Sequence, residues 1–95
     1  MSAPPVTVYT KDHCPYCVRA KALLTRKGVP FEEIDVEGRD DLRTWLVEAT
    51  GQMTLPQIFA GGRALGGYSD LAALDGRGEL DAILRGEAPP VDGAA

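Results

Sequence analysis

The sequence is poor in side chains that bind metals or cross-link the chain. It holds two cysteines and one histidine in 95 residues. A closed structural zinc site needs four ligands, so Cys14, Cys17 and His13 leave that shell incomplete within one chain. A disulfide between residues so close in sequence closes almost no loop, which argues against a purely structural cross-link. These shortages exclude zinc-finger and disulfide-scaffold proteins.

Positive charge and long apolar runs are also scarce. Ten Lys and Arg residues against fourteen Asp and Glu residues give a formal net charge of −4, and no basic cluster marks a nucleic-acid surface. No stretch approaches the length that spans a membrane. The start, Met1–Pro5, has neither a charged nor an apolar segment, which predicts no secretory signal. We therefore expect no nucleic acid and no membrane as partner, and a reducing cytoplasm as the location.

What the sequence does have is a regular alternation of strand and helix patterns. Runs rich in β-branched residues or alternating in polarity predict strands over residues 6–10, 31–36, 57–60 and 63–65, with Gly61-Gly62 as a hairpin turn. Helical spacing of apolar residues predicts helices from Pro15 to Lys27, over Leu42–Ala49, after Ser69 as the N-cap, and over Leu80–Leu84. We expect residues 1–86 to form a single domain and residues 87–95 to form a disordered tail.

The order of these elements predicts the fold class. The first strand, helix and second strand must form a parallel, right-handed unit, and the Gly-Gly hairpin adds an antiparallel pair. The result is an α/β fold, with a central mixed sheet of about four strands and helices on both faces. Trp45 is expected in the core, because it shares a helix face with Leu42 and Leu46.

The chemistry of the chain is concentrated in Cys14-Pro15-Tyr16-Cys17. Proline is favoured at the first helical position, so Cys14 lies at or beside the N-cap, where unpaired N–H groups favour its thiolate. Cys17 follows on the same helix face and within disulfide reach, more buried than Cys14, which we expect to face solvent. A redox dithiol is favoured, and a metal or cluster site bridging two subunits is the alternative. His13 is interpreted as a solvated loop residue.

Three segments in register resemble the dithiol glutaredoxins. Residues 10–17, Thr-Lys-Asp-His-Cys-Pro-Tyr-Cys, resemble the active-site stretch of that family. Residues 54–56, Thr-Leu-Pro, resemble its Thr-Val-Pro segment, and residues 66–70, Gly-Gly-Tyr-Ser-Asp, resemble its Gly-Gly-x-x-Asp segment. Leu55 in place of valine, and the neighbouring Met53, add bulk near the sulfurs without removing a chemical function.

The resemblance implies a thioredoxin-like fold and glutathione as co-substrate, with no metal and no permanently bound cofactor. It implies that Lys11 and Arg43 lie near the glycine carboxylate of glutathione, and that Tyr16 walls the groove. For these three residues, ordinary solvation or packing is the alternative. The implied glutathione-binding residues are Lys11, Tyr16, Arg43, Thr54, Leu55, Pro56, Gly67, Tyr68, Ser69 and Asp70, with the peptide bond between Leu55 and Pro56 in the cis form.

The activity that follows is glutathione-dependent thiol–disulfide exchange by a monomer. Cys14 attacks a protein–glutathione mixed disulfide, and a second glutathione releases the adduct. On protein disulfides, Cys14 attacks first and Cys17 resolves the mixed disulfide. The alternatives are a thioredoxin-like redoxin reduced by a flavoprotein reductase and an iron–sulfur cluster carrier.

Overall fold

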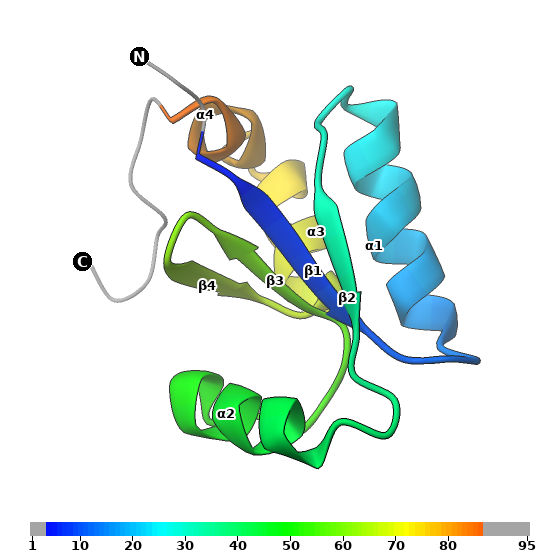
Figure 1. Ribbon diagram of the computed structural model, residues 1–95. Helices are drawn as coiled ribbons and strands as arrows, with labels where there is room; N and C mark the ends of the chain where they lie inside the picture. The colour runs from blue at the N-terminus through cyan, green and yellow to red at the C-terminus, as the bar shows by residue number, and fades with distance from the viewer. Residues whose placement is uncertain (1–3, 87–95) are drawn as a thin grey trace.

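A mixed sheet of four strands forms the centre of the molecule (Figure 1). The computed structural model describes residues 4–86, so the predicted tail lies outside the described residues. The strands are β1 (Val6–Thr10), β2 (Glu32–Asp35), β3 (Gln57–Ala60) and β4 (Arg63–Gly66), in the order β2-β1-β3-β4. β1 pairs parallel with β2 and antiparallel with β3, which pairs antiparallel with β4. The predicted mixed sheet is confirmed.

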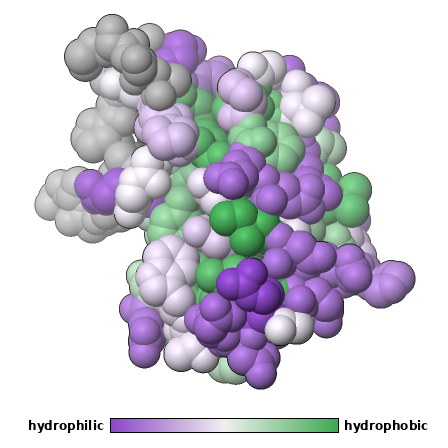
Figure 2. All heavy atoms as spheres, viewed as in Figure 1, coloured by the Kyte–Doolittle hydropathy of each residue, from purple (hydrophilic) through white to green (hydrophobic). Residues whose placement is uncertain are grey.

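Four helices are described around this sheet: α1 (Pro15–Arg26), α2 (Asp40–Thr50), α3 (Tyr68–Gly76) and α4 (Leu80–Arg85). α1 packs beside α3, while α2 lies well apart from both (Figure 1). Among residues 4–86, no helix is long and apolar enough to cross a membrane. On the face shown in Figure 2, hydrophobic residues form small islands among hydrophilic ones.

The core is divided into two clusters by the alternation of side chains along the strands. Val8 and Ile58 point to one face, where they pack with buried residues of α1, α3 and α4. Phe59 points to the opposite face and packs with Val36 and Leu46. Successive strand residues face opposite ways, so β1 and β3 serve both clusters. The sheet therefore carries helices on both faces, as predicted.

Two sequence predictions are wrong in detail. Trp45 was expected in the core, but 43% of it is exposed, because it covers the cluster from outside with its ring 5.7 Å from that of Phe59. Ser69 was expected to cap α3, but Gly67 is the N-cap and Ser69 lies in the first turn. The cause is Asp70, whose carboxylate accepts the Gly67 N–H at 3.0 Å and so starts the helix earlier.

A charge cluster ties the far end of α1 to the C-terminal helices. Lys27, the C-cap of α1, places its Nζ 2.6 Å from a carboxylate oxygen of Asp75 and 2.9 Å from one of Asp81. The Lys27 ammonium lowers the pKa of Asp81, and the two carboxylates raise the pKa of Lys27. One cation thus joins α1, α3 and α4 at the end away from the cysteines.

We predict that Lys27→Met lowers the thermal unfolding temperature at neutral pH. Asp81 has a lowered pKa in the folded protein, so its ion pair stabilises the fold at pH values above the unfolded pKa of ~3.9. This stabilisation is lost as the pH falls through the pKa of the folded protein. The difference from wild type should therefore shrink in acid. Arg26→Met, which removes a neighbouring cation that forms no ion pair within residues 4–86, is the control. An equal difference at neutral and acid pH would contradict this role of the ion pairs.

Candidate active site: a dithiol and two grooves

The two cysteines meet at the start of α1, where β1 ends. Cys14 is the N-cap with extended backbone, and Pro15 occupies the first turn. The Cys17 backbone N–H donates to the Cys14 sulfur at 3.2 Å, so the sulfur satisfies one of the helix's unpaired donors. Both cysteines are free thiols. The predicted position of the dithiol is confirmed.

Burial differs between the two thiols. Only 8% of Cys14 and 2% of Cys17 is exposed, so Cys17 is the more buried, as predicted, but Cys14 is less open than expected. The reason is that the Leu55 carbonyl oxygen lies 3.7 Å from the Cys14 sulfur and covers it. Burial, followed by the hydrogen bond with Cys14, raises the pKa of the Cys17 thiol to about 11. Cys17 is therefore protonated near neutrality.

The segment that covers Cys14 is held by a buried glutamine. The Leu55–Pro56 peptide bond is cis, as the resemblance implied. Gln57, at the start of β3 and fully buried, donates through Nε2 to the Thr54 carbonyl oxygen at 2.9 Å and to the Gln52 side chain at 3.0 Å. These bonds fix the path of the chain from Gln52 to Pro56, and with it the carbonyl group beside the sulfur.

A second segment approaches this one from β4 and α3. Gly66 has a φ of +103°, and a Cβ at this position would overlap the Asp70 carboxylate. A Cβ at Gly67 would lie 3.3 Å from the Pro56 carbonyl oxygen. Gly66 therefore leaves room for the Asp70 carboxylate, and Gly67 allows the close approach of α3 to the cis-proline segment.

One groove runs along these two segments. Tyr16 forms one wall, and its ring stacks on that of Tyr68 with the two centroids 6.1 Å apart. The Arg19 guanidinium lies 5.3 Å from the centroid of the Tyr16 ring. The groove holds about 510 Å³ and brings together eight of the ten residues predicted for glutathione: Tyr16, Thr54, Leu55, Pro56, Gly67, Tyr68, Ser69 and Asp70.

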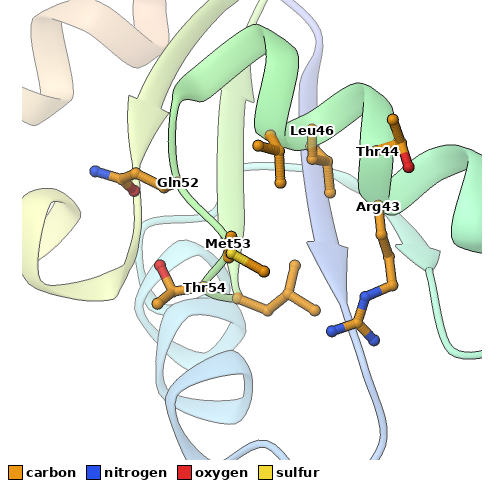
Figure 3. A pocket seen from close by; sticks show the side chains of 8 residues that line it. Arg43, Thr44, Leu46, Gln52, Met53 and Thr54 are labelled. Carbon is orange, nitrogen blue, oxygen red and sulfur yellow. The ribbon is translucent and has the colours of Figure 1, made fainter.

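Arg43 lines a smaller, adjoining pocket between α2 and the same loop (Figure 3). Arg43 and Gln52 lie at opposite ends of it, with Met53 between them (Figure 3). The two cavities share the residues from Gln52 to Leu55 as a common wall. Arg43 therefore adjoins the main groove without lining it.

Lys11 lies elsewhere. It lines a second groove, on the other side of the cysteines, together with His13, Lys21 and Glu33. His13 is exposed, as expected, and has a φ of +56°. Cys14 and Cys17 both border this second groove. Neither cysteine lines the first groove, which holds most of the predicted binding residues and meets the Cys14 sulfur at the Leu55 carbonyl oxygen.

Sequence reasoning missed two residues that shape the site. Gln57 was interpreted as a strand residue, and its role depends on a buried amide that bonds backward to the loop. Gln52 lies in a loop with no periodic pattern, so no signal in the sequence could have marked it. A polar residue directly after the proline, within an otherwise apolar strand, was the available signal for Gln57.

Comparison with known proteins decides the family. The glutaredoxin family model matches residues 6–65. The chain is 52% identical over 81 residues to a glutaredoxin of Pseudomonas aeruginosa, covering 85% of this chain and 96% of the relative. It is 49% identical over 80 residues to glutaredoxin 3 of Escherichia coli, covering 84% and 96%. The chain belongs to the glutaredoxin family.

Solved glutaredoxin structures agree with this assignment. A glutaredoxin from Brucella melitensis superposes with a TM-score of 0.81 at 48% identity, covering 90% of this chain and 92% of that one. A buckwheat glutaredoxin–glutathione complex gives a TM-score of 0.81 at 31% identity, covering 85% and 76%. The fold is thioredoxin-like. As a glutaredoxin, the chain is a glutathione-dependent thiol–disulfide oxidoreductase.

The raised pKa of Cys17 predicts how slowly this thiol reacts when Cys14 is absent. In Cys14→Ser, alkylation of Cys17 by iodoacetamide should be very slow at neutral pH and rise about tenfold per pH unit toward the alkaline range. The rate is measured by mass spectrometry over a pH series. Alkylation that levels off near the free-thiol pKa of ~8.5 would contradict the burial argument.

Proposed function

We propose that Cys14 is the nucleophile in two reactions, reduction of protein–glutathione mixed disulfides and reduction of protein disulfides. The observation that carries this proposal is the Cys14 sulfur at the helix start, where it accepts the Cys17 N–H at 3.2 Å. Hydrogen bonds to sulfur and the positive end of the helix dipole favour the thiolate, which is the attacking species. Cys17, buried and protonated, cannot compete for the first attack.

Glutathione is proposed to bind in the groove between Tyr16 and Asp70. Leu55 lies outside the strand ladder, and in the reduced protein its carbonyl oxygen accepts the Cys14 thiol at 3.7 Å. Once Cys14 is bonded to glutathione that thiol proton is gone, and the Leu55 peptide groups can pair with the extended tripeptide, as an added strand residue does. Asp70, at the start of α3, is suited to accept from the γ-glutamyl amine, while the first N–H groups of that helix suit the neighbouring carboxylate. The buckwheat relative forms a complex with glutathione, which supports glutathione as the ligand.

Arg43 and Lys11 are proposed to contact the glycine carboxylate of glutathione. Arg43 lies beyond the common wall formed by Thr54 and Leu55, at the α2 end of the site. Lys11 borders the cysteines from the other groove. A tripeptide bonded to Cys14 and paired with Leu55 passes between these two cations, and each favours a carboxylate there.

Protein disulfides are proposed to follow a route that uses both cysteines. Cys14 forms a mixed disulfide with the substrate, and Cys17 then displaces the substrate thiol, leaving a disulfide between residues 14 and 17. Two molecules of glutathione reduce this disulfide and are oxidised to one glutathione disulfide. We propose that the protein works as a monomer in a reducing cytoplasm, where glutathione supplies these electrons.

Two serine variants test the division of labour. Cys14→Ser should abolish both activities, because serine is not appreciably ionised near neutrality. Cys17→Ser should keep mixed-disulfide reduction, since glutathione still releases the adduct from Cys14, and should lose most activity on a protein disulfide. Rates are measured on a glutathionylated peptide and on a protein disulfide. Equal loss of mixed-disulfide reduction in both variants would refute the assigned roles.

Lys11→Ala should lower kcat/KM for glutathione about three- to tenfold at low ionic strength, because an exposed cation beside the carboxylate is removed. The loss should narrow as salt is added. Arg26→Ala, which removes a cation from the far end of α1, is the control and should behave as wild type. If Lys11 is only a solvated surface residue, its variant will match the control at every salt concentration.

A further inference from the structure

The second groove contains a charge cluster to which no role has yet been given. Lys21 Nζ lies 2.9 Å from Glu33 Oε2, and the same oxygen accepts the Thr10 hydroxyl at 2.9 Å. Thr10 is almost fully buried at the end of β1. Lys21 is half-buried, and Glu33 is exposed. The Lys21 ammonium is therefore held in a defined place by two neighbouring elements, β1 and β2.

This cluster lies close to the resolving cysteine. Lys21 follows Cys17 by one helical turn on α1, a spacing at which side chains share a face with Cβ atoms about 5–6 Å apart. Cys17, Lys21, Glu33 and Thr10 all line the same groove. Glutathione, by contrast, is proposed to lie in the opposite groove and to reach this one only at Lys11. Lys21 thus lies on the same helix face as Cys17, within the groove that glutathione leaves mostly open.

We propose that Lys21 stabilises the Cys17 thiolate during resolution of the mixed disulfide, and that Glu33 and Thr10 are positioning residues for Lys21. This inference rests on the proposed two-cysteine route. In the resolving step the Cys17 thiol gives its proton to solvent, and the thiolate attacks the Cys14 sulfur. The bond between residues 14 and 17 forms while the bond to the substrate sulfur breaks, and the substrate leaves as a thiolate with the electron pair.

Electrostatics agree with this geometry. Burial, the largest cause of the raised pKa of Cys17, remains when Cys14 carries the substrate, so any group that favours the Cys17 anion changes the rate of resolution. Two effects lower the pKa of Cys17 against burial: a hydrogen bond with the Lys11 backbone and, more weakly, the Lys21 charge. Hydrogen bonds from Lys21 and then Thr10 lower the pKa of Glu33, which keeps its carboxylate charged and Lys21 anchored. The other ionisable groups lining this groove are Lys11, Asp12, His13, Cys14 and Asp35.

The test separates the two chemical steps in one experiment. Reduced protein is mixed with excess dithiobis(nitrobenzoate) in a stopped-flow spectrometer. Attack by Cys14 releases the first thionitrobenzoate, in a phase whose rate rises with reagent concentration. Attack by Cys17 on the mixed disulfide releases the second, in a phase that is independent of reagent concentration. A first phase that persists unchanged in Cys14→Ser would refute the proposed function. The rate of the second phase alone reports on the role of Lys21.

Lys21→Met and Lys21→Gln should slow the second phase about fivefold near neutral pH, and more than they slow the first phase. The difference should narrow toward about pH 11, where the Cys17 thiol ionises without help from a cation. Lys21→Arg keeps a cation and should restore the rate, while Arg26→Met, on the same helix, should leave it unchanged. Circular dichroism is used to check that each variant is folded. If Lys21→Met does not fold, Lys21→Gln takes its place.

Two results would overturn the inference. One is a second phase in both neutral variants that is as fast as in wild type. The other is an equal slowing of both phases in the neutral variants, with no recovery of either rate in Lys21→Arg. That result would mean that Lys21 only links α1 to β2 structurally.

Discussion

The hydrogen bond from the Cys17 N–H to the Cys14 sulfur is the interaction on which the rest of the site depends. It exists because a short loop after β1, which ends at Thr10, leads to Pro15 as the first residue of α1, so that Cys14 occupies the N-cap. The unpaired N–H groups of the first turn then face a sulfur atom instead of a hydroxyl or carboxylate cap. The same turn places Cys17 within reach of Cys14 but under cover. One local structure therefore gives the two thiols different chemical roles.

The second requirement is a wall that stands against Cys14 and still leaves a groove open. Gln57 anchors the loop that carries Leu55, and Gly67, the N-cap of α3, lets that helix approach the loop closely. Asp70 closes the arrangement by capping its own helix through Gly67. These contacts join three parts of the chain that are distant in sequence. The glutathione groove is a product of tertiary packing, while the nucleophile is a product of local structure.

This difference explains what the sequence could predict. The strands, the mixed sheet and the position of Cys14 follow from short-range patterns, because proline and the cysteines act within a single turn. The exposure of Cys14 could not be predicted, since Leu55 covers it from across the fold. The burial of Trp45 could not be predicted from periodicity either. Its spacing shows which face of the helix it lies on, but not how far the buried cluster extends beneath that face. Most of the predicted glutathione-binding residues share one groove, whereas Lys11 and Arg43 lie beside it.

The central claim is that glutathione bonded to Cys14 lies in the groove between Tyr16 and Asp70 and leaves the Lys21 side open. The direct measurement is the position of glutathione in the Cys17→Ser protein trapped as its Cys14–glutathione mixed disulfide, from intermolecular nuclear Overhauser contacts with isotope-labelled protein. The account predicts contacts to Tyr16, Leu55 and Tyr68, and none to Val18 or Lys21. Contacts to the Lys21 side, without contacts to Leu55, would contradict it.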